Sequence, residues 1–382
     1  MTRRLLFLGI AFSAIGCAEV LPLDGRHCPC ASGYHCCESG NVCVPRAKEC
    51  PRWRSLDPVG LNAIGISPTF DFKIAADGAP HIAGLTCDAA CNEQGGLGVP
   101  FGARCVDDSW VTLTQEGLPR SYFFPLLLIG RDGTLHLLSD GMSSSFDGTT
   151  WAQRFPPVPG DGLAGSTVVE DEEGRIVTTI REDTDGSVPA ELSVVRLEGS
   201  TWTALGSKLP GELNLNSLVV RDETLCIAHV HWYETGYLGP LSCFDGSEWA
   251  TVKEFQSNLA GGVGIGPDGA FYVAPWDGLL MTVMEGKRAR WSEIGSLFAT
   301  HAQLAVSKNR TVFVLVTSLE RNTSMVAAWR PDTREWSYYT TEGLDGSVRP
   351  LLAIGDDGDE PVPYLAYQIY DPVASFKVVK HE

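Results

Sequence analysis

The 382-residue sequence predicts an all-β protein, in which a seven-bladed β-propeller follows a small disulfide-rich module. Three observations predict this fold. Short runs of Val, Leu, Ile and aromatic residues alternate with Asp-Gly turns, and long amphipathic helical stretches are missing. A Trp recurs at intervals of 41 to 51 residues along the body of the chain, and a cluster of six cysteines precedes that body. Six or eight blades are the alternatives to seven.

The amino terminus is typical of an export signal. Arg3 and Arg4 precede an apolar run over residues 5–15, which is too short to cross a bilayer, because a spanning helix needs about 20 apolar residues. The stretch Ala14-Ile15-Gly16-Cys17 follows, and it resembles the lipobox of bacterial lipoproteins. The alternative is an ordinary secreted protein in which Cys17 lies near the cleavage site by chance.

The lipobox resemblance implies an exported protein that is held at a membrane by a lipid. Residues 1–16 would be a signal peptide, cleaved before Cys17, and residues 17–27 would form a tether. Cys17 would carry a diacylglyceryl thioether and an acylated amine, and more than one acyl chain makes anchoring stable. Ala18 stands where Asp would signal inner-membrane retention. The resemblance therefore implies the outer membrane, at its periplasmic or cell-surface face.

The net charge of the chain is strongly negative. Asp and Glu total 47 and Lys and Arg 29, for a formal charge of −18, and the loss of Arg3 and Arg4 with the signal takes it to −20. Nucleic-acid binding depends on neutralising phosphates with Lys and Arg. The sequence therefore predicts no nucleic-acid partner.

Residues 28–50 are expected to form a small Cys-rich disulfide module. A segment this short cannot bury a core and needs cross-links, and six cysteines allow fifteen pairings. The order of single and paired cysteines resembles knottin-type and hevein-like modules. A zinc cluster is the competing interpretation, which an oxidising compartment disfavours. The cysteines are Cys28, Cys30, Cys36, Cys37, Cys43 and Cys50.

Five further cysteines lie in the body of the chain. Cys226 and Cys243 fall on expected neighbouring strands of one repeat, and Cys87 and Cys105 occupy similar places in another. Both pairs are therefore predicted disulfides. Cys91 is left over, and it is either free, a replacement for one of those partners, or bonded outside its repeat.

The body, residues 51–382, is built from repeats. Each unit has an Asp-Gly or related turn between two β-like runs, and a Trp follows some 20 to 30 residues later. A period of about 40 to 50 residues with four strands per unit is typical of propeller blades. The six complete units end at Trp110, Trp151, Trp202, Trp249, Trp291 and Trp336.

A seventh unit starts near Leu351 and turns at Asp357-Gly358, but it lacks the strand that carries the Trp. Residues 51–57, which contain Trp53, resemble the missing strand. We expect this segment to pair with the three carboxy-terminal strands and close the ring. Such a closure would also cover exposed strand edges, which otherwise invite aggregation.

The recurrent Trp and the turns are expected to be structural. One large aromatic side chain per blade would pack against the neighbouring blade, and the Gly of each turn accepts a positive φ without steric cost. Residues 146–151, Phe-Asp-Gly-Thr-Thr-Trp, resemble the Asp-box turn of sialidase-like propellers, although this stretch is one residue shorter than that box. That box is structural and says little about catalysis.

Catalytic and metal signatures are weak. A sialidase-type site needs three arginines around the centre, and that family's Arg-Ile-Pro motif is absent. His229 and His231 share one face of a strand, but a catalytic zinc wants a third ligand, and none is evident. Residues 183–186 and 356–360 lack the full loop pattern of a Ca²⁺ site, so solvated turns are the favoured interpretation. No catalytic residue, metal or cofactor is predicted. The arginines instead fall at blade hairpins, at Arg131, Arg175, Arg221 and Arg310.

Candidate ligand-binding residues lie where the chain leads into the innermost strands. Propeller ligands usually meet the face that these links build. The polar side chains there could hydrogen-bond a glycan or a peptide, or could line a hydrated channel. They are Asp71, Arg120, Tyr122, Asn214, Asn216, Asn258, His301, Gln303 and Arg349.

Together these features favour a non-enzymatic, lipid-anchored propeller that binds a protein or glycan partner at the cell envelope. The first alternative is a scaffold subunit in envelope assembly. The second is a glycan-processing hydrolase or lyase, which would require several carboxylates or arginines to meet at the central channel.

Overall fold

A computed structural model provides the structure of the protein. It divides into two units, residues 1–50 and 51–382, which are treated separately below. The structure describes residues 32, 34–37, 42–46, 53–56, 70–86, 98–121, 125–139, 142–153, 156, 158, 163–182, 191–210, 217–233, 236–256, 262–275, 280–287, 290–298, 301–318, 323–340, 348–357, 360–371 and 373–381.

The first unit contains a two-stranded antiparallel hairpin. Strand β1 (Tyr34–Cys37) pairs with β2 (Val42–Pro45), and the register sets Cys36 opposite Cys43. The disulfides predicted for residues 28–50, the lipobox and the tether lie outside the described residues or rest on side chains that the structure does not describe. The lipid anchor and the knottin-like arrangement therefore stay predictions.

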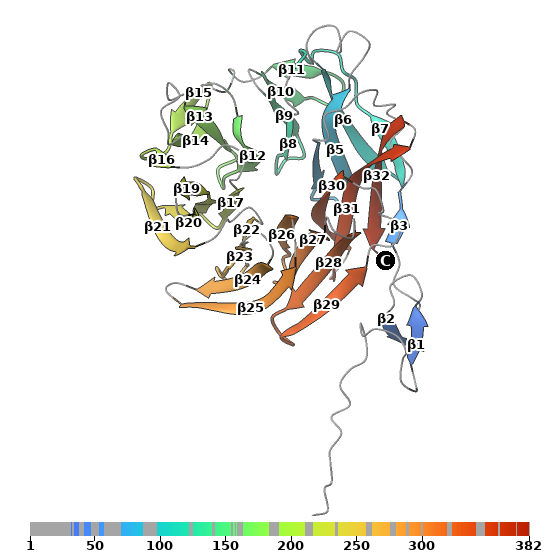
Figure 1. Ribbon diagram of the computed structural model, residues 1–382. Helices are drawn as coiled ribbons and strands as arrows, with labels where there is room; N and C mark the ends of the chain where they lie inside the picture. The colour runs from blue at the N-terminus through green and yellow to red at the C-terminus, as the bar shows by residue number, and fades with distance from the viewer. Residues whose placement is uncertain are drawn as a thin grey trace, which may run out of the picture. The chain divides into compact units, whose positions relative to one another are not determined.

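The second unit is a seven-bladed β-propeller, in which seven small antiparallel sheets form a ring (Figure 1). The chain passes outward through each blade, from an inner strand to an outer one. The inner strands contact one another in a closed circuit, in the order β4, β8, β12, β17, β22, β26, β30 and back to β4. This confirms the predicted fold class and the predicted number of blades.

The first three blades follow one another along the chain. Blade 1 contains β4 (Asp71–Ile74), β5 (Pro80–Thr86), β6 (Val99–Val106) and β7 (Ser109–Thr112). Blade 2 contains β8 (Leu126–Ile129), β9 (Leu135–Ser139), β10 (Met142–Phe146) and β11 (Trp151–Gln153). Blade 3 contains β12 (Leu163–Glu170), β13 (Ile176–Glu182), β14 (Glu191–Glu198) and β15 (Thr201–Ala204), and β16 (Leu209–Pro210) also pairs with β14.

Blades 4 to 6 continue the same course. Blade 4 contains β17 (Ser217–Arg221), β18 (Thr224–Ala228), β19 (His231–Tyr233), β20 (Gly236–Phe244) and β21 (Trp249–Phe255); both β19 and β21 pair with the long β20. Blade 5 contains β22 (Val263–Ile265), β23 (Phe271–Val273), β24 (Leu280–Lys287) and β25 (Arg290–Phe298). Blade 6 contains β26 (His301–Val306), β27 (Val312–Ser318), β28 (Thr323–Arg330) and β29 (Glu335–Thr340).

Blade 7 is assembled from both ends of the second unit. Strands β30 (Val348–Asp357), β31 (Glu360–Asp371) and β32 (Val373–His381) are followed by β3 (Trp53–Ser55), which lies beside β32 in Figure 1. The register sets Trp53 opposite His381. This is the three-plus-one pairing that the sequence predicts for Trp53, in a strand whose described part is shorter than residues 51–57.

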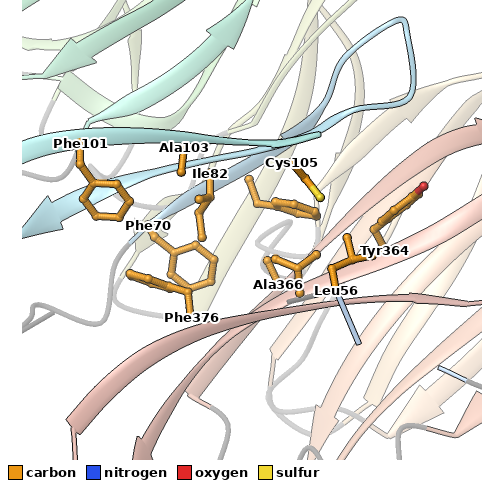
Figure 2. Packing of buried hydrophobic residues seen from close by; sticks show 11 residues of the cluster. Leu56, Phe70, Ile82, Phe101, Ala103, Cys105, Tyr364, Ala366 and Phe376 are labelled. Carbon is orange, nitrogen blue, oxygen red and sulfur yellow. The ribbon is translucent and has the colours of Figure 1, made fainter. Parts of the chain in front are cut away.

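A separate hydrophobic cluster fills each interface between neighbouring blades. At the interface of blades 7 and 1, Leu56, Phe70 and Phe101 pack with Phe376, and the rings of Phe70 and Phe376 lie 4.9 Å apart at their centroids (Figure 2). The amide of Leu56 also donates a hydrogen bond to Val378 O at 2.9 Å. The segment that closes the ring thus contributes directly to a blade-to-blade core.

The recurrent Trp residues lie on the outer strands and join neighbouring blades. In four of them, the indole N–H donates to a backbone carbonyl of the preceding blade or of the link that leaves it. A buried Trp N–H usually finds such an acceptor. These hydrogen bonds run from Trp151 to Thr114 (2.7 Å), Trp202 to Pro156 (3.0 Å), Trp249 to Leu205 (2.6 Å) and Trp336 to Ile294 (2.8 Å).

Candidate functional site

The predicted ligand-binding residues are spread along the inner strands and the links that lead into them. Asp71 is on β4, Gln303 is on β26, and Arg120 is exposed in the link from blade 1 to blade 2. His301 lies on β26 and Arg349 on β30, but their side chains are not described. The remaining four candidates lie outside the described residues: Tyr122, Asn214, Asn216 and Asn258.

Asp71 is buried and holds blade 1 against blade 2. Its Oδ1 accepts a hydrogen bond from the amide of Phe72 at 2.8 Å, and its Oδ2 accepts one from the amide of Leu127, on the inner strand of blade 2, at 2.9 Å. The ammonium of Lys73 lies 3.4 Å from Oδ1. A buried carboxylate needs such partners, since an unpaired buried charge is costly. Both oxygens of Asp71 are therefore engaged within the protein.

Gln303 plays the same part between blades 6 and 7. Its Oε1 accepts a hydrogen bond from the buried amide of Leu352, on the inner strand of blade 7, at 2.6 Å. In blade 4, a third side chain joins inner strands: the guanidinium of Arg221 donates to Ile265 O of blade 5 at 2.8 Å. The polar inner-strand positions singled out in the sequence thus include groups that fix the spacing of the blades.

These joining roles depend on the stagger between adjacent inner strands. A side-chain oxygen of Asp71, and likewise of Gln303, accepts a hydrogen bond from a backbone amide on the inner strand of the next blade. Such an amide would otherwise lack a hydrogen-bond partner, at a cost of about 1–3 kcal/mol. The sequence shows that Asp71 and Gln303 are polar and near an inner strand. It does not show which backbone amide of the next inner strand each side chain faces.

Three of the described histidines, one each in blades 1, 2 and 4, serve packing. His229 is buried, with Nδ1 2.7 Å from Pro210 O and Nε2 3.3 Å from Ser242 Oγ. His81 is also buried, with Nδ1 3.0 Å from Ala79 O, and this burial lowers the pKa of its imidazole. The Nδ1 of His136 lies 2.7 Å from the hydroxyl of Ser145, which is fully buried. The partners of His81 and His136 thus lie within their own blades, whereas those of His229 lie in blades 3 and 4.

Metal ligands do not gather within the part of the chain that the structure describes: no group of three or more His, Cys, Asp or Glu side chains there could hold an ion. Of the two acidic stretches, residues 183–186 lie outside the described residues. In the other stretch, the carboxylate of Asp356 pairs with the ammonium of Lys308 at 2.6 Å. Nor does any described helix have the length and apolar character needed to span a membrane.

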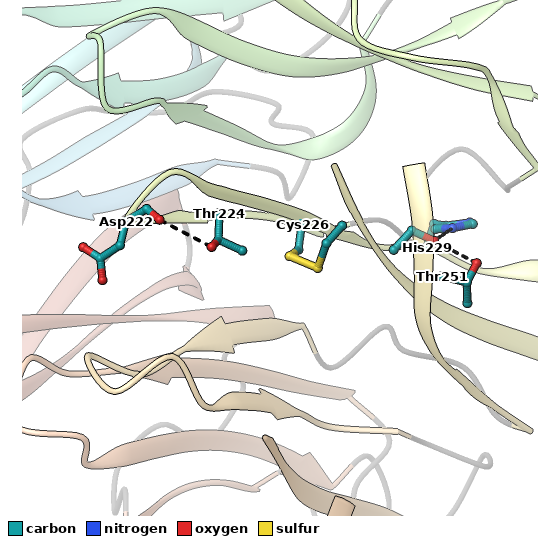
Figure 3. The surroundings of a disulfide bond; sticks show 7 residues. Asp222, Thr224, Cys226, His229 and Thr251 are labelled. Atoms are coloured by element: carbon teal, nitrogen blue, oxygen red, sulfur yellow. Dashed lines mark hydrogen bonds between the residues drawn. A yellow bond between two sulfur atoms is a disulfide. The ribbon is translucent and has the colours of Figure 1, made fainter. Parts of the chain in front are cut away.

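A disulfide joins the second and third main strands of blade 4. Cys226 on β18 bonds to Cys243 on β20, directly opposite in the register, between the Asp222 turn and His229 (Figure 3). This confirms the predicted pair. Cys105 is buried at the interface of blades 1 and 7, whereas Cys87 and Cys91 lie outside the described residues, so the Cys87–Cys105 disulfide stays a prediction.

Two exposed aspartates organise the outer hairpins of blades 2 and 4. Asp147 Oδ1 accepts hydrogen bonds from the amides of Thr149 and Thr150 at 2.9 and 2.8 Å, and these bonds lower the pKa of its carboxyl to about 2. Asp245 does the same with the amides of Ser247 and Glu248, both at 2.8 Å, which lowers its pKa too. The box-like stretch 146–151 is therefore a turn in which the side chain caps the backbone.

The chain matches no known protein family and no curated protein in sequence. Its fold is similar to those of solved structures. One is an ulvan lyase, described as a new family of polysaccharide lyase, with a TM-score of 0.50 and 11% identity over 85% of this chain and 95% of its own. A protein of unknown function from Dyadobacter fermentans gives a TM-score of 0.47 at 11% identity, with 86% and 99% covered.

A third similar structure is the acylaminoacyl peptidase of Pyrococcus horikoshii, with a TM-score of 0.47 and 8% identity over 80% of this chain. The chain spans about half the length of that enzyme, 51%. At such low identities, similarity shows the fold alone. The likeness to the ulvan lyase agrees with the seven-bladed β-propeller that the sheet order shows.

Proposed function

We propose that the protein is an exported, lipid-anchored β-propeller that binds a protein or glycan partner at the cell envelope and catalyses no reaction. Export is supported by the Cys226–Cys243 disulfide, because disulfides form and persist in oxidising compartments. The lipobox resemblance at Cys17 supports the anchor, with the outer membrane as its place.

Binding is supported above all by how the inner strands use their polar side chains. Asp71 Oδ2 and the amide oxygen of Gln303 each accept a hydrogen bond from the inner strand of the next blade, so these groups hold the ring in one geometry. A rigid ring presents the links between its blades as a fixed surface, and binding residues are often found on loops positioned by such a scaffold. The exposed Arg120 lies on one of those links.

The anchor is tested by mass spectrometry of the membrane fraction. The mature protein is expected to begin at Cys17 and to carry acyl chains, and the Cys17→Ala variant is expected to leave that fraction. An unmodified amino terminus at any other residue would refute the lipid anchor, while leaving the binding proposal open to the next experiment.

Binding is tested with a glycan array and with affinity capture of envelope proteins. The matched variants are Arg120→Ala, in a link that leads into an inner strand, and Arg334→Ala, in an exposed turn that the strand order places at the opposite end of its blade. Each removes one positive charge. A ligand of the proposed face should lose affinity with Arg120→Ala and keep it with Arg334→Ala, and equal affinity for both variants would place the site elsewhere.

Two alternatives remain as proposals for the same experiments. A scaffold subunit in envelope assembly would capture a stable set of envelope proteins and give a blank array. A glycan-processing hydrolase or lyase would shorten a bound polysaccharide on incubation. The ulvan lyase shares the fold of this chain, but the likeness brings no catalytic residue with it.

A further inference from the structure

The outer-strand Trp has a directly opposite residue in every blade. This residue lies on the neighbouring strand of the same sheet, and such directly opposed side chains are the unit of sheet stabilisation. In blades 1 to 6 it is a small or apolar residue, and in blade 7 it is a histidine. The opposed residues are Cys105, Phe146, Leu197, Phe244, Gly286, Trp329 and His381.

His381 lies between two aromatic rings that come from different strands. Its ring centroid is 5.2 Å from that of Trp53, on the amino-terminal strand β3, with the planes at 75°. The His381 centroid is also 4.5 Å from that of Tyr339, on the outer strand of blade 6, with the planes at 78°. The imidazole thus joins the two ends of the ring and the preceding blade in one row of edge-to-face contacts.

The strand that this row holds is short. Within the described residues 53–56, Trp53, Arg54 and Ser55 pair with β32, and the side chains of Arg54 and Ser55 are exposed. Trp53 is partly buried against the cluster between blades 6 and 7. A three-residue edge strand has few hydrogen bonds of its own, so its pairing depends on the ring contacts of Trp53 and on the burial of Leu56.

We infer that His381 is an acid-sensitive latch: protonation of its imidazole releases β3 from β32 and opens the ring at blade 7. The physical reason is that a charged imidazolium is poorly solvated between Trp53 and Tyr339, whereas in the open state it meets water. The other six blades have no titratable imidazole opposite their outer Trp, so their outer strands are not released in this way.

The described charged groups near the latch carry both signs. Arg330 of blade 6 and Glu360 of blade 7 act on Tyr339, and they carry opposite charges. Arg54 of β3 pairs with Asp108 of blade 1, and Lys380 lies opposite Arg54 in the register. Burial is the cause that lowers the pKa of His381, from its ordinary value of 6.5 to about 4.

The pH window follows from these two values. The open state binds a proton near pH 6.5 and the closed state only near pH 4, so closure is fully favoured above pH 6.5 and weakens as the pH falls toward 4. Between pH 8 and pH 5 the opening equilibrium is expected to rise about 30-fold. Given the export proposed above, on which this step rests, the protein meets external pH, and acid would free the amino-terminal strand from the propeller.

The test is amide hydrogen exchange of the purified full-length chain at pH 8 and pH 5, corrected for the intrinsic rate. The reporter is the Leu56 amide, which donates to Val378 O, and the internal reference is the Leu205 amide, which donates to Val194 O of blade 3 at 2.8 Å. Protection at Leu56 should fall about 30-fold in the wild type and stay level at Leu205.

Two variants decide whether His381 is responsible. His381→Phe copies the residue found opposite Trp151 and Trp249, and His381→Gln keeps a polar side chain that does not titrate. Both should abolish the acid-dependent loss of protection at Leu56. An equal loss in both variants would overturn the proposal and assign the response to another group, such as the buried His81. A wild type without the loss would overturn it as well.

Discussion

Blades 4 and 7 keep their strands together in opposite ways. In blade 4, successive segments of chain form the sheet, and the Cys226–Cys243 disulfide ties its second and third main strands. In blade 7, three strands come from the carboxy-terminal end and the outermost comes from the other end of the propeller. Strand β3 is held there by its pairing with β32, by ring contacts and by Leu56. The ring is therefore reinforced covalently in one blade and closed non-covalently in another.

The difference between the two blades indicates that the propeller can open at blade 7 and not at blade 4. Removing a covalent link changes the stability of blade 4 but leaves its strands contiguous in sequence. Releasing β3 leaves blade 7 with an uncovered edge on β32, and exposed edges invite pairing with other chains. Substitutions at the closure should therefore produce local opening and association, whereas substitutions in blade 4 should lower stability without exposing an edge.

The largest effect is expected from Leu56→Ala, which attacks the closure. Leu56 is buried in the cluster between blades 7 and 1, and truncating a buried Leu typically costs about 2–5 kcal/mol through lost burial and the cavity left behind. We expect the free energy of unfolding to fall by about 3 kcal/mol in urea denaturation. Ser55→Ala, one residue away and exposed, is the control; it removes the hydrogen bond that the Ser55 hydroxyl donates to Leu56 O at 3.1 Å and should cost no more than about 1 kcal/mol. Equal losses in both variants would contradict a closing role for Leu56.

Removal of the disulfide tests the covalent side of the comparison. Cys226→Ala combined with Cys243→Ala opens a loop with a sequence separation of 17, for which the expected loss is about 2–3 kcal/mol. The free energy of unfolding of the variant in denaturant should lie below that of the oxidised wild type by this amount, and protection of the Leu56 amide should be unchanged. A variant as stable as the oxidised wild type would show that blade 4 does not depend on the bond.

Much of this arrangement can be predicted from sequence because the repeats carry it. The Trp period places one Trp on each outer strand. The seventh unit has no Trp strand of its own, and Trp53 therefore identifies residues around it as the closing strand. The Cys226–Cys243 pair follows from the same strand assignment. In each case a local pattern and one period suffice, because side chains directly opposite in a sheet are fixed by register.

The candidate site was predictable only as a set of polar positions. That Asp71 meets the Leu127 amide and Gln303 the Leu352 amide depends on how two inner strands are staggered, which no sequence pattern records. The repeat pattern also did not predict the small strands β16 and β19. Each pairs with a strand that already belongs to a four-stranded blade, β14 or β20, so neither forms a repeat of its own.

A smaller effect is expected where neighbouring blades are joined by side chains alone. Asp71→Ala leaves the buried Leu127 amide without its acceptor, for an expected loss of about 2 kcal/mol. Lys73→Ala is the matched control, because it removes the ammonium 3.4 Å from the carboxylate and leaves both amide hydrogen bonds in place. Thermal unfolding should separate the two variants. A Lys73→Ala loss as large as that of Asp71→Ala would show that the ion pair, and not the inter-blade hydrogen bond, matters.

The smallest expected effect is the loss of stability in acid, which should occur in different pH ranges for blade 4 and blade 7. Hydrogen bonds from the Glu248 and Ser247 amides lower the pKa of Asp245 in blade 4 below its ordinary 3.8. A lowered carboxyl pKa stabilises the fold above the unfolded value and loses that contribution as the pH falls below it, so blade 4 should lose it only below about pH 4. The closure of blade 7, through His381, should weaken already between pH 6.5 and 4.

Asp245→Asn should therefore flatten the fall in melting temperature below pH 4 and leave the change between pH 6.5 and 4 intact. The matched control is Asp332→Asn, in the exposed outer turn of blade 6. It makes the same replacement of a carboxylate by an amide, but in a different turn. His381→Phe should do the reverse of Asp245→Asn, by removing the change at the higher pH only. If Asp245→Asn altered the slope above pH 4, the two acid responses would be coupled through the ring, and the independence of blades 4 and 7 would have to be given up.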